Sequence, residues 1–344
     1  MIAEMKAGIQ ENVAKTNKRR KPIGGDGVNF EMTIDLANGG VYLDKTPIKN
    51  HFGQKYGEVE VDKGKIHISV SLPKYLRDNN ITPFGIADFD SLKSLVNDLK
   101  HGLNSVLAGL LGDDADVMDA TAKSIECNIT LPVVGKATCS QVLNLINRAH
   151  VTGTNVVYQR ASNRCIYDKE NETVIIKKKN NYTLKCYDKS LQQSREGHPV
   201  ESGLLRIEIV MQDRVIKRLF GNKSTIRDIL TKQGLMKIIA EYKRIFTEDI
   251  MSRFIYPCLK EVATILYSTL RDTGSQLETI ALHKTLIMDE MIFRKALERW
   301  YKVNGFTRMR ARQNTATYIS RNKEKYGFPE NVIGTLKEFE KLCK

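Results

Sequence analysis

Three segments of the chain alternate apolar and polar residues, which is typical of β-strands that bury one face. They span residues 66–72, 125–131 and 205–209. Successive side chains of a strand point to opposite faces, so each segment would bury its apolar residues and present its polar residues on the other side. That polar side would carry His67, Glu126 and Glu208. Acidic groups on a sheet of a basic protein are candidates for holding a divalent cation against a phosphate.

Length and charge narrow the classes of partner. The 344 residues fit one large domain or two ordinary ones, and 54 basic against 40 acidic residues give a net charge of +14. This excess favours a polyanion such as nucleic acid or an anionic membrane surface, although a merely soluble basic protein is the plain alternative. No run approaches the ~20 apolar residues of a membrane span, and no apolar signal-peptide core follows Met1. Six scattered cysteines without a CxxC pair predict a reducing cytoplasm.

The order of expected elements predicts an α+β fold with a central antiparallel sheet and packed helices, followed by a mainly helical C-terminal region. Residues 1–27 are expected to form a basic flexible arm, 28–245 the α+β catalytic domain, and 246–344 a helical DNA-engaging region. Strands are expected at 29–35, 58–72, 124–133, 155–160, 164–168, 172–177, 182–188 and 203–211. Apolar spacing predicts helices at 92–110 and 139–149, and the chain is expected to be helical from residue 224.

The segment 182–188 places a tyrosine among cations. Strand alternation puts Lys185 and Tyr187 on one face and Tyr182 on the other. A phenol flanked by Lys185 and Lys189 can have a lowered pKa and attack a phosphate, while the lysines offset charge on the phosphate oxygens. The alternative is a tyrosine at a strand edge beside solvated lysines.

Glu126 and Glu208 are candidate ligands for Mg²⁺ or Mn²⁺, since Mg²⁺ is often bound by one or two carboxylates together with substrate phosphate and water. Arg206, two residues before Glu208, offers the alternative of a surface ion pair. His67 is a candidate third ligand or phosphate contact, although a lone histidine on a strand is more often structural.

Ten basic residues and two glutamates lie between Arg294 and Lys325, with tyrosines and Phe306 interleaved. Basic side chains can neutralise phosphates while aromatic rings stack on exposed bases. Arg308, Arg310 and Arg312 are therefore expected DNA contacts, with a solvated helix face as the alternative. Lys177 and Lys178 are further expected DNA contacts.

Four segments carry a family resemblance when they are taken together and in order. They are 68–80, which runs from a small-residue strand through Pro73-Lys74-Tyr75 to Asn80, the acidic strand 124–129, the Lys-x-Tyr-x-Lys element of 185–189, and the Arg-x-Glu strand 205–209. This set resembles the rolling-circle replication initiators of the filamentous-phage gene II/X type, which also occur on small bacterial plasmids. The resemblance covers roughly residues 29–245.

The resemblance implies a metal-dependent, site-specific DNA nickase and strand transferase with a core similar to the HUH endonucleases. Such proteins cut one strand of origin DNA, single-stranded or supercoiled, through a tyrosine that keeps the 5′ phosphate, and they act beside host replication proteins. Here Tyr187 would attack, with Lys185 and Lys189 orienting the phosphate, and His67 and Asn80 would complete the site.

Two departures from the family pattern keep alternatives open. The expected His-x-His pair is absent, and isoleucine stands at 175 where many members carry another tyrosine. Tyr182 and Tyr158 therefore stay possible nucleophiles. A non-catalytic DNA-binding regulator on the same fold is one rival function, a plasmid mobilisation relaxase with the same chemistry is another, and a structural protein with incidental basicity is the third.

Overall fold

A computed structural model describes residues 27–35, 43–49, 53, 55–62, 65–72, 75, 95, 97–99, 101, 117–152, 163–168, 173–178, 180–195, 197, 200, 202–222 and 224–343. Its centre is a sheet of nine described strands in the order β2-β3-β4-β1-β5-β9-β8-β7-β6, and every described pairing is antiparallel. The strands are β1 (Gly27–Asp35), β2 (Leu43–Lys49), β3 (Lys55–Asp62), β4 (Lys65–Ser71), β5 (Thr121–Pro132), β6 (Asn163–Asp168), β7 (Thr173–Lys178), β8 (Tyr182–Asp188) and β9 (Leu204–Gln212). The predicted α+β class and antiparallel sheet are confirmed.

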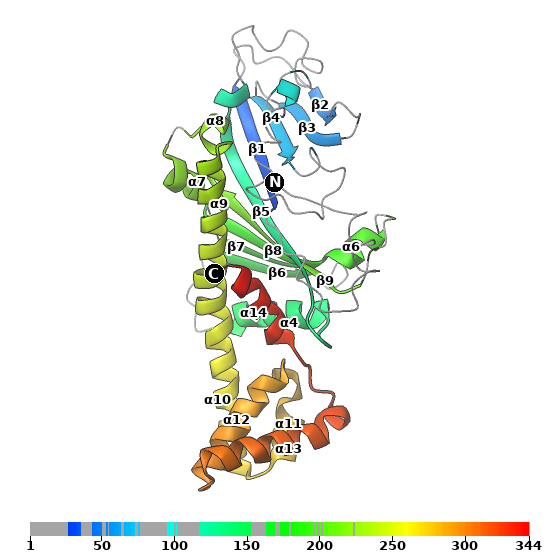
Figure 1. The fold of residues 1–344 in the computed structure, drawn as a ribbon, viewed down its shortest axis with the longest axis vertical. Helices are drawn as coiled ribbons and strands as arrows, with labels where there is room; N and C mark the ends of the chain where they lie inside the picture. Colours follow the sequence, from blue (N-terminus) through cyan, green and yellow to red (C-terminus); the bar gives the residue numbers. More distant parts are fainter. Residues whose placement is uncertain are drawn as a thin grey trace.

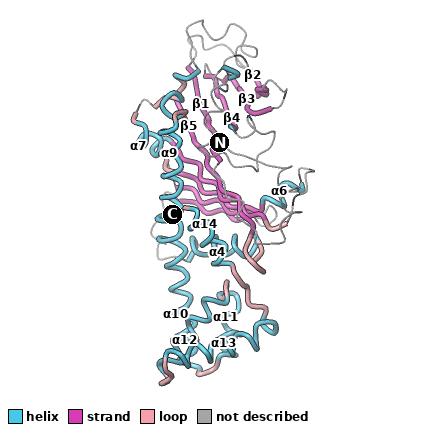
Figure 2. The backbone as a smooth tube through the Cα atoms, in the orientation of Figure 1, coloured by secondary structure: helices cyan, strands magenta, loops and turns pink. Residues whose placement is uncertain are grey.

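Helices cover one face of the sheet and extend well beyond it (Figures 1 and 2). They are α4 (Cys139–Thr152), α6 (Lys189–Arg195), α7 (Asp213–Phe220), α8 (Ile226–Ile229), α9 (Lys232–Arg244), the π-helical η3 (Ile245–Ile255), α10 (Tyr256–Thr273), α11 (Gln276–His283), α12 (Glu290–Val303), α13 (Arg308–Tyr326) and α14 (Val332–Leu342), with short 3-10 turns η2 (Val117–Asp119) and η4 (Lys284–Leu286). The helical C-terminal region is therefore confirmed. No described helix is long and apolar enough to span a membrane.

Alternation along the strands builds the core on one side of the sheet. In β5, β8 and β9 the alternate residues Ile129, Leu184 and Ile207 are at most 1% exposed. α4 and α9 contact this sheet, and the Tyr242 hydroxyl of α9 donates a hydrogen bond of 3.1 Å to the Ile207 carbonyl. The polar residues of these strands therefore lie on the face of the sheet that α4 and α9 do not cover.

The structure differs from the expected strands in two places. The single strand expected at 58–72 is two antiparallel strands, β3 and β4, and β2 has no counterpart among the expected strands. The strand expected at 155–160 lies outside the described residues. Of the helix expected at 92–110, the described residues 95, 97–99 and 101 are helical, with Leu95 and Leu99 buried.

One continuous helix runs through α9, η3 and α10, since the backbone keeps right-handed helical angles at both junctions. Figure 1 shows it extending along the molecule from the sheet to the cluster of α11, α12 and α13. The domain boundary expected between residues 245 and 246 falls inside this helix. The arm expected at 1–27 lies outside the described residues except for Gly27, which begins β1.

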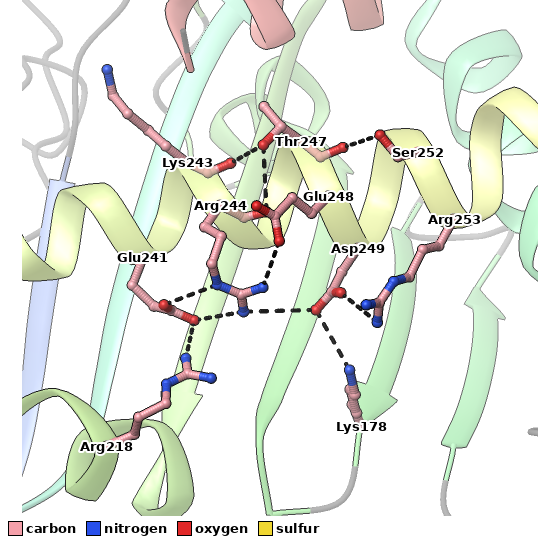
Figure 3. Close-up of polar contacts among 10 residues, drawn as sticks. All are labelled: Lys178, Arg218, Glu241, Lys243, Arg244, Thr247, Glu248, Asp249, Ser252 and Arg253. Atoms are coloured by element: carbon pink, nitrogen blue, oxygen red, sulfur yellow. Dashed lines mark hydrogen bonds and ion pairs between the residues drawn. The ribbon is translucent and has the colours of Figure 1, made fainter.

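Ion pairs fix the long helix to its neighbours (Figure 3). Buried Asp249 pairs with Lys178 of β7 at 3.5 Å and with Arg253 at 2.9 Å. Arg244 contacts both Asp249 at 3.9 Å and buried Glu241 at 2.8 Å. The π-helical segment therefore holds its buried carboxylate against β7, the strand next to the edge of the sheet.

Candidate active site

A cluster of four charged residues and a tyrosine lies on the polar face of β5, β8 and β9. Strand pairing places Lys185 beside Glu208 and Tyr187 beside Arg206. The Lys185 ammonium Nζ lies 3.1 Å from Glu126 Oε2 and 3.7 Å from Glu208 Oε2. Glu126, Glu208, Lys185 and Tyr187 are therefore brought together from three adjacent strands, as their alternation predicted.

The Tyr187 hydroxyl donates a 2.5 Å hydrogen bond to Glu208 Oε1. Of the two flanking lysines, Lys185 contacts the carboxylates, and Lys189 is fully buried with its ammonium donating to Gln192 at 2.8 Å. The phenol therefore contacts a carboxylate. This differs from the prediction that Lys185 and Lys189 both lie beside it. Lys189 begins α6, where the chain leaves the strand and its alternation no longer applies.

Glu208 is the most enclosed carboxylate of the cluster, with the side chain 7% exposed. Burial, and next the nearby Glu126 carboxylate, raise the pKa of Glu208, although Arg206, Lys185 and the Tyr187 hydrogen bond act in the opposite direction. The pKa of Lys185 is raised because its two carboxylate neighbours outweigh the opposing effect of burial. A carboxylate whose pKa lies above the ordinary range is a better proton acceptor than a solvated one.

The cluster contains residues that sequence reasoning did not assign to it. Arg206 is 1% exposed, its Nε donates to Thr130 Oγ1 at 2.7 Å, and its Nη1 lies 4.0 Å from Glu208 Oε1. This is a buried charge contact and not the surface ion pair considered above. Asn128 lies opposite Glu208 on β5, is 2% exposed, and its buried Nδ2 has no hydrogen-bond partner among the described residues. Strand alternation places Arg206 and Asn128 on the same face of the sheet as Glu208, so alternation was the sequence signal that could have identified them.

A polar pocket of about 240 Å³ opens beside the cluster, and it is lined by Ser69, Ser124, Glu126, Lys177, Thr183, Lys185 and Val210. Lys177 lines this pocket and is exposed. Lys178 faces the other side, where it pairs with Asp249 and its Nζ lies 5.3 Å from the centre of the Tyr182 ring. One of the two expected lysines therefore faces the candidate site.

The alternative nucleophile Tyr182 lies on the helix-covered face. Its side chain is 3% exposed, and burial followed by the Asp249 carboxylate raises its pKa. A buried phenol held in its neutral form beside a carboxylate is poorly placed to reach a DNA phosphate. Tyr158 and Asn80 lie outside the described residues.

His67 lies apart from the two glutamates. The register places it level with Thr33 and, through that residue, Thr121, whereas Glu126 is level with Asn29 and Ser71. His67 and Ser71 are four residues apart on β4, which is about 13 Å at the usual strand rise. His67 therefore does not join Glu126 and Glu208 in one coordination sphere in this arrangement.

The oxygen donors of Glu126 and Glu208 suit Mg²⁺ or Mn²⁺ by their chemistry, but the Lys185 ammonium lies between them. Among the described residues, no group of three or more His, Cys, Asp or Glu side chains could hold a metal ion. A divalent cation would fit between these carboxylates only after Lys185 moved away.

The expected DNA contacts Arg308, Arg310 and Arg312 lie in the first turns of α13 and are exposed. Arg312 Nε lies 4.0 Å from Glu298 Oε2 of α12. Figure 1 places α13 at the end of the molecule remote from β1–β4, beyond the sheet that carries Tyr187. These arginines are therefore a separate surface from the tyrosine cluster.

Comparison with solved structures finds a distant likeness. No protein-family model and no curated protein matches the chain. A solved structure of a rolling circle replication initiator protein from Geobacillus stearothermophilus aligns with a TM-score of 0.29 and 11% identity, over 68% of this chain and 85% of that one.

Proposed function

We propose that this protein nicks and rejoins a DNA strand, with Tyr187 as the nucleophile. The observation that carries the proposal is the 2.5 Å hydrogen bond from the Tyr187 hydroxyl to Glu208. A phenol that attacks phosphorus must give up its proton, and a partly desolvated carboxylate in contact with it is a suitable acceptor. The nearby Lys185 and Arg206 supply positive charge for the phosphate and its transition state.

In the forward step, Tyr187 Oη would form a bond to the scissile phosphorus while its proton passes to Glu208. The bond from phosphorus to the 3′ oxygen would break, and that oxygen would take a proton from solvent. The products would be a 5′-phosphotyrosyl DNA and a free 3′ hydroxyl, which can prime synthesis. Attack by a 3′ hydroxyl on the phosphotyrosyl bond would reverse these transfers and rejoin a strand.

Dependence on Mg²⁺ or Mn²⁺ is a separate part of the proposal. Glu126 and Glu208 would hold the ion after substrate phosphate drew Lys185 out of the space between them. The ion would supply charge stabilisation at the phosphate oxygens. The role of origin DNA as substrate and the likeness to rolling-circle initiators and HUH cores rest on the motif resemblance alone.

The direct test is nicking of a supercoiled plasmid that carries the DNA flanking the gene, with and without divalent metal. Replacing Tyr187 by Phe is expected to abolish both nicking and covalent attachment, because the ring is kept and only the attacking oxygen is lost. Tyr182→Phe is the matched control and is expected to retain both. Full activity of the Tyr187→Phe variant would remove this residue from the chemistry.

A non-catalytic DNA-binding regulator is the second candidate. The observation in its favour is the internal charge balance of the cluster, in which Lys185 and Arg206 are already paired with Glu126 and Glu208. Specific binding of the flanking DNA without cleavage under any metal condition would support it. A mobilisation relaxase would share the chemistry of Tyr187 and differ in cutting a transfer origin in place of a replication origin.

A further inference from the structure

A second cavity lies between three helices of the C-terminal region, away from the tyrosine cluster. It has a volume of about 360 Å³ between α10, α12 and α14. Each helix contributes one face to it, because the lining positions recur at intervals of three or four residues. The lining residues are Tyr256, Leu259, Lys260, Ala263 and Thr264 of α10, Met291, Lys295 and Arg299 of α12, and Ile333 and Lys337 of α14.

The cavity combines an apolar floor with a cationic rim. Leu259 and Ile333 are buried, and Met291, at 41% exposure, is one of the most exposed large apolar side chains described. The rim residues Lys260, Lys295, Arg299 and Lys337 are all exposed, and no acidic residue lines the cavity. This composition attracts a ligand that has both apolar surface and negative charge.

The rim cations are not neutralised from within the protein. Lys260, Lys295 and Lys337 form no ion pair with any described residue. Two nearby carboxylates have partners outside the cavity: Glu298 lies 4.0 Å from Arg312, and Glu338 pairs with Lys341 at 2.6 Å. Glu340 accepts a 2.5 Å hydrogen bond from the lining residue Tyr256 and does not itself line the cavity. Arg299 stacks on Tyr267, with its Cζ 4.0 Å from the ring centre, whereas the charges of the three lysines face solvent.

Asp289 holds the walls of this groove in place. Its carboxylate is fully buried and accepts hydrogen bonds from the backbone of Met291 at 2.8 Å and of Ile333 at 2.9 Å. The first turn of α12 and the first turn of α14 are thus tied to one side chain. A ligand would enter a preformed groove and would not have to order it.

We propose that this groove binds an amphipathic helix of another protein, one that carries an aliphatic stripe flanked by Asp or Glu. Three helix faces leave room for the apolar face of a fourth, and the four cations complement acidic flanks. A second copy of this chain, with a net charge of +14, complements the rim poorly. Single-stranded DNA would favour stacking surfaces, but the floor is aliphatic and the one aromatic lining residue, Tyr256, has its hydroxyl bound to Glu340.

The test uses a fluorescein-labelled helical peptide of about 18 residues with Leu at helical spacing and Glu on both flanks, since that spacing gives one apolar face. Fluorescence anisotropy would measure its binding to the full chain. A scrambled peptide of the same composition and an oligothymidylate of similar length are the comparison ligands. The variants are Lys260→Glu/Lys337→Glu, the exposed floor variant Met291→Gln, and Lys232→Glu/Lys284→Glu, a matched charge reversal at exposed lysines outside the groove.

The amphipathic peptide is expected to bind, and Lys260→Glu/Lys337→Glu is expected to weaken it by about tenfold, a change of about 1.4 kcal/mol. Met291→Gln should weaken it too, whereas Lys232→Glu/Lys284→Glu and Tyr187→Phe should not. Equal binding of the scrambled peptide, equal loss in the control variant or no binding would overturn the proposal. Displacement of the peptide by oligothymidylate that itself depends on Lys260 and Lys337 would identify a nucleic-acid site and overturn it as well.

Discussion

Tyr187 and Tyr182 show what alternation along a strand can decide. The sequence alone places Tyr187 on the same face of the strand as Lys185 and places Tyr182 on the opposite face, and the structure confirms both placements. It is not sufficient to identify the partner of the phenol, because that depends on which strands lie beside β8. The antiparallel pairing with β9 brings Glu208 to the hydroxyl, and the pairing of β9 with β5 brings Glu126 to Lys185.

The pH dependence of nicking tests the role of Glu208 as proton acceptor. Its carboxylate must be ionised to accept the proton, and burial raises its pKa above the ordinary 4.5. The nicking rate is therefore expected to rise with pH along a limb whose midpoint lies above 4.5. Single-turnover rates on supercoiled DNA would measure this limb, and a midpoint at or below the ordinary glutamate value would contradict the assignment.

The decline of the nicking rate at low pH can be distinguished from unfolding of the protein. A carboxyl whose pKa is higher in the folded state than in the unfolded state binds its proton more tightly when folded. Glu208 by itself therefore makes the free energy of unfolding rise as the pH falls through this range. Circular dichroism at the same pH values is expected to show a folded protein while the nicking rate declines.

Lys185 is expected to compete with a divalent cation for the two carboxylates. In the Lys185→Met variant this ammonium is absent, so Mn²⁺ should bind about tenfold more tightly without DNA, a gain of about 1.4 kcal/mol. Titration calorimetry would measure the affinity. The gain should disappear in Lys185→Met/Glu126→Gln, which lacks one of the two ligands, and equal affinities of the wild-type protein and Lys185→Met would contradict the competition.

At the scale of elements, the long helix is fixed by buried carboxylates. Arg244 pairs with Glu241 and Asp249, whose side chains are 6% and 4% exposed, and its hydrogen bond to Glu241 raises its pKa. Arg244→Met would leave both carboxylates with fewer cations, and a loss of about 2 kcal/mol in the free energy of unfolding is expected. This is below the usual cost of an isolated buried charge because Arg218 and Arg253 remain as partners.

Urea denaturation would measure that loss, with Arg271→Met as the matched control. Arg271 is fully solvated and pairs with exposed Asp272, so its replacement is expected to change stability little. Equal effects of the two substitutions would mean that the network in Figure 3 does not stabilise the long helix.

Strand positions were predictable where alternation was strong, as in β5, β8 and β9. The hairpin of β3 and β4 was merged into one segment because the apolar alternation of 58–62 and 66–72 suggested a single strand. A domain boundary was expected between residues 245 and 246 because the composition shifts near that point, and the structure has one continuous helix there. Composition indicates which segments are apolar, but the continuity of a helix depends on local backbone angles.

At the scale of the whole molecule, the basic turns of α13 and the tyrosine cluster are separate surfaces (Figure 1). If Arg308, Arg310 and Arg312 contact DNA phosphates, replacing all three by Gln should reduce the slope of log affinity against log salt by about 2 to 3, since each phosphate contact contributes a little under one. Anisotropy of labelled DNA across a KCl series would measure the slope. Gln at the exposed lysines 49, 232 and 284 is the matched control. An equal change of slope in that control would mean that the α13 arginines act only through the net charge of the protein and do not contact phosphates.

The helical end is nevertheless attached to the sheet through the C-terminus. α14 packs against α4 and β5, and the Val134 amide donates a 3.0 Å hydrogen bond to the buried Thr335 hydroxyl. This connection gives the α13 surface a defined position relative to the sheet. Because the α13 arginines are not part of the tyrosine cluster, the triple arginine variant should still form the covalent product at saturating DNA.

If Tyr187 is the nucleophile, it becomes covalently joined to DNA during the reaction. Mass spectrometry of peptides from the full chain, after reaction with the flanking DNA and nuclease trimming, measures this directly. We expect a nucleotide 5′-phosphate on the peptide that contains Tyr187, and its absence in Tyr187→Phe. An adduct on any other residue, or strand cleavage that leaves no adduct, would contradict it.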